Sequence, residues 1–323
     1  MSAGPLNAGA PSTVGAGQRH GAEAIPDDGR WELLRALGSI ATESPPGSDL
    51  CCAALGLPRW ERYEHTNVFV LDLPPHASVY LGGEGGLGGS VADAAAGIWR
   101  AMGLVPPDEP DHLGALLALY AHLGESIPRC TTGVAAERLA HAMRVILWEH
   151  LWTWCPSYLG ALAAGPTDGS PAKAWAALLD AALKREASLS EPPSVLPSVL
   201  GEAPTPISAD PSLDELLDTL TATVRSGFIV TFSDLSSAAK RVGVGLRRGE
   251  RRFALRSMLE QDPGGTLSWM AEHARLWESR HTATSFGPDG NPGPGQLIAE
   301  WWASRAAHTA TVLEMVAGTS RER

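Results

Sequence analysis

The chain has 323 residues, of which 44% are hydrophobic and 19% are charged, and its formal net charge is −11. A chain of this length and composition can bury a substantial core, in one large domain or in two moderate ones. The negative charge disfavours non-specific binding of nucleic acid, although an acidic surface can attract a basic peptide. No nucleic-acid partner is therefore expected.

The N-terminal segment carries no recognisable targeting signal. Residues 1–28 are rich in Gly, Ala, Ser and Pro and lack periodicity, which predicts a disordered tail. No basic region precedes an apolar core there, and no apolar run in the chain approaches the roughly 18 residues of a spanning helix, so stable membrane insertion is not expected. The four cysteines include no C-x-x-C pair, which indicates reduced thiols. These features predict a cytoplasmic protein.

Helical periodicity dominates the first half of the chain. From residue 29 on, the run GRWELLRALGSIA follows an acidic start and has apolar residues at helical spacing. The run VFVLDL, 68–73, is the most strand-like stretch, although a buried extended segment would fit it equally well. The glycine-rich run 82–89 predicts a flexible or tight turn. Helices are expected at 89–102, 111–124, 134–154 and 171–188.

The second half follows a proline-rich break. Residues 188–212 are almost without periodicity, which predicts a linker. The predicted organisation is a tail over 1–28, a helical domain over 29–187, this linker, and a C-terminal helical region over 213–323. Because helical patterns cover both parts, the predicted fold class is all-α, a helical bundle. The helices expected after the linker are 213–226, 233–242, 249–261, 264–280 and 295–317.

The stretch PPDEPDHLGALLALYAHLGE, 106–125, raises the first question about function. Glu109 and Asp111 place negative charge where a helix N-terminus favours it, and Pro110 suits a first helical turn. Leucines and Tyr120 form one stripe and small residues occupy the other side, which indicates a central helix of a bundle. Helix initiation and recognition of a basic partner are both compatible with this pattern.

The same stretch offers little for catalysis or metal binding. His112 and His122 are ten residues apart, about 15 Å along a helix, and neither H-x-x-x-H nor H-E-x-x-H occurs. An acid–base pair of Asp111 and His112 lacks a nucleophile elbow such as G-x-S-x-G. The glycine-rich run lacks the lysine of a phosphate-binding loop. We expect no enzyme activity, no metal and no cofactor.

Tryptophans gather in the run ILWEHLWTWCPSYL, 146–159. Trp148, Trp152 and Trp154 fall on the last turns of a helix that Pro156 is expected to end. Because the three indoles spread widely around the helix axis, we expect at least one of them to lie near the surface or to line an apolar groove.

A basic segment, 240–256, carries seven basic residues in an otherwise acidic chain. The preceding run SDLSSAAKRVGV has a loose helix-turn-helix cadence. A helical DNA-binding transcriptional regulator is therefore the alternative function. A solvated basic face, or contact with acidic parts of the same chain, is the favoured explanation of this segment.

The order and spacing of these segments resemble the TorD/DmsD/NarJ family of chaperones dedicated to molybdoenzymes. The resemblance covers roughly residues 30–190. It rests on EPDHL at 109–113, on PPHASVYLGGEGGLGG at 74–89, on WRAMGL before the acidic motif, and on LWEHLWTWCPSYL after it.

The resemblance implies a helical bundle of the TorD-like type, here with an additional C-terminal helical region. Its partner would be the apo form of a molybdenum or iron–sulfur oxidoreductase subunit, bound through a twin-arginine leader or another segment until cofactor insertion is complete. Acids would meet the arginines and apolar surface would accept the leader's hydrophobic stretch. The sequence leaves the oligomeric state open, a homodimer included. The client-binding candidates are Tyr80, Glu109, Pro110, Asp111, His112, Trp152 and Trp154.

Overall fold

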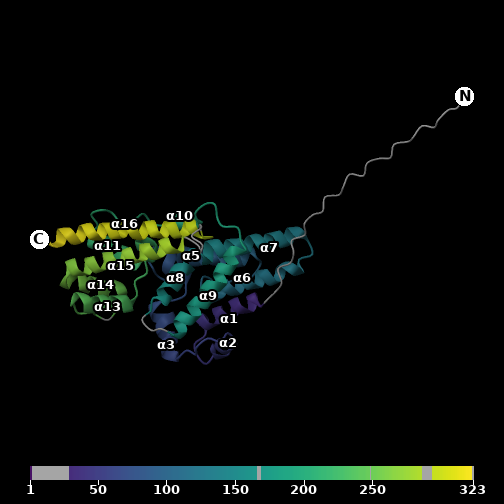
Figure 1. Ribbon diagram of the computed structural model, residues 1–323, viewed down its shortest axis with the longest axis horizontal. Helices are drawn as coiled ribbons and strands as arrows, with labels where there is room; N and C mark the ends of the chain where they lie inside the picture. Colours follow the sequence, from purple (N-terminus) through teal and green to yellow (C-terminus); the bar gives the residue numbers. More distant parts are fainter. Residues whose placement is uncertain (2–28, 166–168, 248, 286–292, 322–323) are drawn as a thin grey trace.

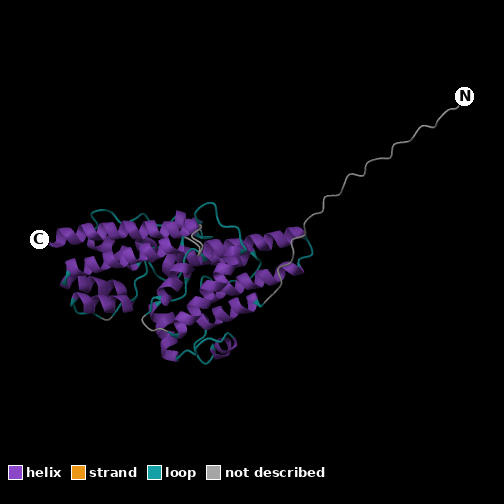
Figure 2. Cartoon of the chain, in the orientation of Figure 1, coloured by secondary structure: helices purple, strands orange, loops and turns teal. Residues whose placement is uncertain are grey.

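The computed structural model describes Met1 and residues 29–165, 169–247, 249–285 and 293–321. The predicted tail, apart from Met1, lies outside the described residues. Over the described part of the chain, Figure 2 shows helices and loops and no β-strand. The predicted all-α class is confirmed.

The N-terminal region forms a bundle around α6 (Leu113–Ser126), which packs against α1 (Arg30–Thr42) and α7 (Gly133–Val145) (Figure 1). Most side chains of α6 are buried, as its two-sided pattern predicted. The other elements of this region are α2 (Asp49–Ala54), α3 (Arg62–Thr66), the π-helix η1 (Asn67–Asp72), α4 (Ala77–Leu81), α5 (Gly89–Ala101), the 3-10 turn η2 (Ile127–Arg129), the π-helix η3 (Ile146–Leu151), α8 (Cys155–Ala163) and α9 (Pro171–Ser188).

Two glycines allow α1 and α6 to cross in close contact. A Cβ atom added at Gly38 would lie 3.0 Å from Cα of Gly114. A Cβ atom at Gly114 would lie 2.9 Å from the carbonyl oxygen of Gly38 and would also meet Oγ1 of Thr42. These separations are below the usual contact distance of carbon atoms. The small side of α6 therefore has a direct structural use, since it brings two backbones together.

A buried carboxylate joins three helices on the other side of the bundle. Glu186 of α9 is only 4% exposed, and it accepts a hydrogen bond of 2.9 Å from the hydroxyl of Tyr120 in α6. Its second oxygen lies 3.8 Å from the guanidinium of Arg30 at the start of α1. A buried charge is stable only when it is paired and hydrogen-bonded, and Glu186 has both kinds of partner.

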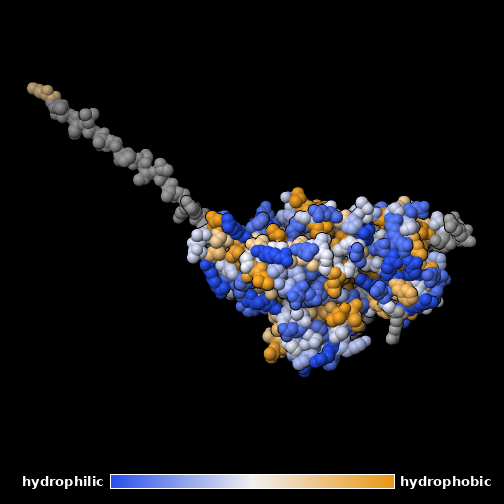
Figure 3. Space-filling view, turned by 180° about the vertical axis from the view of Figure 1, so that it is seen from behind, coloured by the Kyte–Doolittle hydropathy of each residue, from blue (hydrophilic) through white to orange (hydrophobic). Residues whose placement is uncertain are grey.

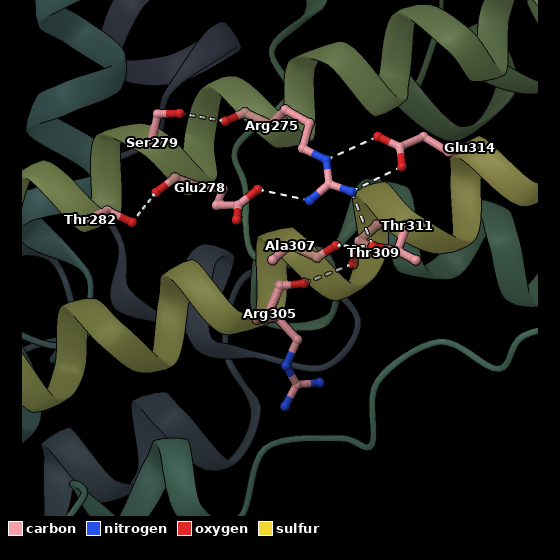
Figure 4. A network of polar contacts seen from close by, with 9 residues as sticks. All are labelled: Arg275, Glu278, Ser279, Thr282, Arg305, Ala307, Thr309, Thr311 and Glu314. Atoms are coloured by element: carbon pink, nitrogen blue, oxygen red, sulfur yellow. Dashed lines mark hydrogen bonds and ion pairs between the residues drawn. The ribbon is translucent and has the colours of Figure 1, made fainter.

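The C-terminal region is a second set of helices. Its two longest members, α15 (Pro263–Thr284) and α16 (Gln296–Arg321), lie side by side (Figure 1). Figure 4 shows that Arg275 of α15 bridges to Glu314 and Thr311 of α16 while also pairing with Glu278. The other helices are α11 (Leu213–Thr221), α12 (Thr223–Ser226), α13 (Phe232–Val242) and α14 (Arg251–Gln261).

Local capping chemistry explains where several of these helices begin. The Thr231 hydroxyl accepts from the Asp234 amide, and the Asp234 carboxylate accepts from the Thr231 amide, which makes a complete capping box at α13. At α15, Asp262 caps the Gly265 amide while Pro263 occupies the first turn, where its missing N–H costs no hydrogen bond.

The two regions share one continuous hydrophobic core. The glycine-rich loop takes part in the junction, because the Gly83 carbonyl accepts a hydrogen bond of 2.6 Å from Arg225 of the C-terminal region. The segment 189–212 crosses between the regions with one short helix, α10 (Ser198–Gly201). It is held on α16, since the carbonyl oxygens of Pro204 and Ile207 accept from Arg305 and His308. The division into domains stays a prediction.

Most predicted helices agree with the observed ones apart from their ends, but one predicted helix is divided and one strand-like interpretation is wrong. The run 68–73, expected to be extended, lies mostly in η1. Phe69 is buried while its neighbours Val70 and Leu71 are exposed, so the apolar run does not alternate between two faces as a half-buried strand would. The helix expected at 213–226 is divided at Ala222, whose backbone is extended.

The close crossing of α1 and α6 predicts that Gly114→Ala destabilises the fold. The added methyl group meets backbone and the Thr42 hydroxyl, and such overpacking costs about 1–3 kcal/mol in the free energy of unfolding. Urea unfolding followed by circular dichroism measures this change. Gly160→Ala in α8 is the matched control, because a methyl group there meets nothing within 4 Å and helix propensity favours alanine. A Gly114→Ala protein as stable as the wild type would contradict this account of the crossing.

Candidate functional site

The acidic motif lies where two separated segments of the chain pair with each other. The backbone of residues 75–77 bonds to that of 111–113: the Ala77 amide donates to the Asp111 carbonyl at 3.1 Å and the Leu113 amide donates to the Pro75 carbonyl at 2.8 Å. His76 and His112 form the resulting isolated antiparallel bridge. This bridge sets the starts of α4 and α6 side by side.

Two neighbouring residues of the motif cap these two helices. The Asp111 carboxylate accepts a hydrogen bond of 2.9 Å from the Ser78 amide in the first turn of α4. The His112 ring accepts through Nδ1 from the Gly114 amide at 3.0 Å, in the first turn of α6. Side-chain acceptors at helix starts satisfy amides that have no partner inside the helix. Asp111 and His112 thus each cap one helix. We call this pair of contacts the double cap.

The motif does start helices, as predicted, but its residues do so differently from the prediction. Asp111 does not cap the helix that follows it but the start of α4, more than thirty residues earlier in the chain. The cap of α6 is His112, a residue type that is not among the preferred caps. Sequence reasoning missed the partner of Asp111 because a contact of this kind depends on the tertiary fold.

His76 completes the site, although it was not among the candidates. Its ring packs edge-on against that of His112, with centroids 4.7 Å apart. Both of its ring nitrogens are buried and neither makes a hydrogen bond within the described chain, while Nε2 lies 3.4 Å from a carboxylate oxygen of Glu109. Glu109 itself remains largely exposed, with 65% of its side chain accessible. Of the four residues of the motif, Glu109 alone therefore presents its side chain to solvent.

The electrostatics of the double cap favour a neutral His112. Burial lowers its pKa to about 4, and the neighbouring His76 adds to this effect, while Glu109 and Asp111 oppose it. The neutral ring matches the geometry, because Nδ1 must carry a lone pair to accept from the Gly114 amide. The site thus holds an exposed carboxylate near the neutral ring of His112, which suits binding of a cation better than proton transfer at neutral pH.

Tyr80 and Trp154 lie together inside the bundle. Their rings are stacked, with centroids 5.2 Å apart and planes within 6° of parallel. The Tyr80 hydroxyl donates to the Pro74 carbonyl at 2.9 Å, and burial raises the pKa of this hydroxyl well above its usual value, so it stays a donor. Trp154 donates through Nε1 to the His150 carbonyl at 2.7 Å. Both side chains are core residues that support the segment next to the double cap.

The expected surface tryptophan is not present. Trp148, Trp152 and Trp154 are all buried, at 3%, 8% and 0% exposure. The helical stretch ends at Leu151, earlier than expected, and α8 begins at Cys155 with Pro156 in its first turn. The turn between them changes the direction of the chain. In contrast to the expectation from the sequence, the three indoles therefore do not spread around the axis of one straight helix. Proline here starts a helix as well as following one.

The basic segment 240–256 is used within the chain. Arg252 and Arg256 pair with Asp214 of α11, and Arg241 pairs with Glu272 of α15. These contacts fit the favoured explanation of an internal contact with acidic residues. They give no support to the alternative of a DNA-binding regulator, since the described arginines named here already have carboxylate partners.

A cleft between the two regions has no counterpart in the sequence reasoning. Its volume is about 500 Å³, within the range of ligand pockets. The N-terminal region supplies one wall from α3, η1, α8 and α9, and the C-terminal region supplies the other from α13, its N-cap residue Thr231, and α15. We call it the inter-lobe cleft. The residues that line the cleft include Glu64, Val68, Asp72, Leu162, Ala164, Asp234, His273, Trp277 and Arg280.

Exposed apolar side chains are distributed over the surface. The face in Figure 3 shows several separate hydrophobic patches among hydrophilic residues. No helix among the described residues is long and apolar enough to cross a membrane. Within the same residues, no three His, Cys, Asp or Glu side chains converge on a position where they could hold a metal ion.

Comparison with known proteins identifies one related segment. Residues 58–159 match the family described as nitrate reductase delta subunit. This match supports a family of molybdoenzyme maturation chaperones, without selecting the TorD or DmsD type. The matched segment contains all seven client-binding candidates and ends before the C-terminal region. No curated protein and no solved structure matches the chain.

The double cap predicts that Asp111→Ala lowers the free energy of unfolding by about 1–2 kcal/mol, because the Ser78 amide loses its acceptor. Asp111→Asn retains a carbonyl oxygen at this position and should keep most of the stability. Urea unfolding of the three proteins compares them directly. Equal losses for both variants would show that the charge of Asp111, and not its hydrogen bond, is what matters.

Burial of His112 also predicts a pH dependence. An ordinary histidine in the unfolded chain titrates near about 6.5, whereas His112 in the folded chain titrates at about 4. The unfolded state binds more protons between these values, so this contribution to stability is lost as the pH falls from about 6.5 to about 4.

His112→Asn keeps an acceptor for the Gly114 amide and removes this titration. Between pH 7 and pH 5 we expect the variant to lose about 1–2 kcal/mol less than the wild type in urea unfolding. The other buried histidines contribute equally to both proteins, so the difference isolates His112. Parallel pH curves for the two proteins would rule out a depressed pKa at this residue.

Proposed function

We propose that this chain is a cytoplasmic, client-specific chaperone that binds a molybdopterin-containing oxidoreductase subunit before its cofactor is inserted. The observation that supports it most strongly is the match of residues 58–159 to the nitrate reductase delta subunit family. That segment contains the complete double cap and the stacked pair of Tyr80 and Trp154. The proposed action is non-enzymatic.

In this proposal the client contact is made by the exposed part of the acidic motif. The Glu109 carboxylate is accessible and lies beside the ring of His76, so it is available to a lysine or arginine of the client. Pro110, Asp111 and His112 are buried and hold Glu109 in place. Tyr80, Trp152 and Trp154, also buried, would act through the shape of the bundle and not by direct contact.

The finer parts of the proposal concern the client segment and its fate. A twin-arginine leader is the segment whose charge suits both Glu109 and the net charge of −11. Holding such a leader would delay export until the enzyme is assembled, with the chaperone in the cytoplasm as a monomer or homodimer. An internal segment of the same subunit with a basic side chain would satisfy the same chemistry.

Co-purification tests the proposal. An affinity-tagged chain is expressed together with the molybdoenzyme subunits encoded in the same genome, and bound proteins are identified by mass spectrometry. We expect one oxidoreductase subunit in its cofactor-free form, with recovery lowered about tenfold by Glu109→Gln, since a hydrogen bond to a charged group is lost. Asp108→Asn, an exposed neighbouring acid, is the matched control. Recovery of no oxidoreductase subunit by the wild type would refute the function.

A further inference from the structure

The inter-lobe cleft carries uncompensated charges on both of its walls. Glu64, on the wall of the N-terminal region, is partly buried, and its carboxylate makes no hydrogen bond or ion pair within the described chain. Burial and the nearby Glu61 raise the pKa of its carboxyl group. A carboxylate that is desolvated beside another acid gains most from a cation that enters the cleft.

The remaining charges keep the cleft acidic. Asp72 and Asp234 also line it, and burial lowers the pKa of His273, which leaves that ring neutral at pH 7. Three carboxylates and the single guanidinium of Arg280 leave a net charge of −2 on the lining residues. Asp72 is already bonded to the Phe232 amide at 2.9 Å. Glu64 is therefore the carboxylate with full capacity for a new partner.

Arg280 lines the same space, and its guanidinium makes no hydrogen bond or ion pair within the described residues. Burial lowers the pKa of this guanidinium, although Asp234 opposes the effect. Its guanidinium lies 5.1 Å from the ring centroid of Trp277, which supports it from one side. A guanidinium in this position can donate to carbonyl oxygens, which an extended peptide backbone supplies in a row.

Apolar side chains fill the space between these charges. Val68 of the N-terminal wall is partly exposed and Leu276 of the C-terminal wall is 48% exposed. Leu162 and Trp277 also line the cleft but are buried. A fully charged or fully polar ligand would leave this apolar surface without a contact. The best complement combines a cationic group, backbone acceptors and at least one apolar side chain.

We infer that the inter-lobe cleft binds an extended peptide segment of the client, in which a basic side chain pairs with Glu64, backbone carbonyls accept from Arg280, and an apolar side chain packs on Val68 and Leu276. This rests on the proposed function for the identity of the client. The C-terminal wall lies outside the segment that matches the delta subunit family. The C-terminal region thereby gains a function, since it completes a site that the matched segment alone does not enclose.

A binding assay with defined peptides tests this inference on the full chain without the client. The probe is a short acetylated and amidated peptide with one arginine between two leucines, and its counterpart carries glutamine in place of arginine. Fluorescence anisotropy of labelled peptides gives the dissociation constants. We expect the arginine peptide to bind the wild type about tenfold more tightly than the glutamine peptide, with this preference lost in Glu64→Gln. Glu137→Gln, at an exposed glutamate of α7 outside the cleft, should retain it.

A second variant tests the position of the peptide independently of charge. Ala164 is exposed and lines the cleft, whereas its exposed neighbour Ala163 does not. Ala164→Trp should weaken both peptides about tenfold or more by filling the space, and Ala163→Trp should not. Equal affinity of the wild type for the two peptides, or unchanged binding by Glu64→Gln and Ala164→Trp, would overturn the inference. If the chain binds the peptides but co-purifies with no oxidoreductase subunit, the result would support the cleft as a peptide-binding site and refute the proposed client.

Discussion

The double cap is the interaction on which the arrangement of the N-terminal region depends. Asp111 and His112 are adjacent in sequence, yet one satisfies the start of α4 and the other the start of α6. The bridge between 75–77 and 111–113 brings these starts together. Tyr80, at the end of α4, is thereby placed against Trp154, so the aromatic core and the acidic motif form one unit. The motif's acidity is thus largely structural, with Glu109 as its accessible part.

Because most residues of the motif are structural and only Glu109 is accessible, the expected binding surface of a partner changes. Residues that are buried and hydrogen-bonded position their neighbours, and direct recognition falls to side chains with unused bonding capacity. The side chains proposed for direct recognition are Glu109 beside the double cap, and Glu64 and Arg280 in the inter-lobe cleft. The C-terminal region supplies Arg280 and Trp277, which connects its packing against the matched segment with a proposed role in recognition.

Much of this fold could be predicted from the sequence because most helices combine an amphipathic pattern with clear ends, as the capping box of Thr231 and Asp234 illustrates. Prediction failed where the tertiary fold decides. The run 68–73 is rich in residues that favour strands, but most of it lies in η1, where Phe69 is buried while Val70 and Leu71 are exposed. The seven candidate residues belong to one neighbourhood only in part, and the burial of all of them except Glu109 was not foreseen. The contact from Asp111 to Ser78 and the cleft residues Glu64 and Arg280 join distant segments, so no local pattern reveals them.

Mapping the contact surface of a client complex by hydrogen–deuterium exchange is the most direct test of the central claim, that the acidic motif organises the bundle while recognition uses its accessible edge and the cleft. The account predicts that client binding slows exchange of amides in 64–73 and 273–280, on the two walls of the cleft. Amides at 112–114 should be protected already in the free chain, because each donates a hydrogen bond in or next to the double cap. Fast exchange at 112–114 in the free chain, with client protection there and none at the cleft, would contradict it.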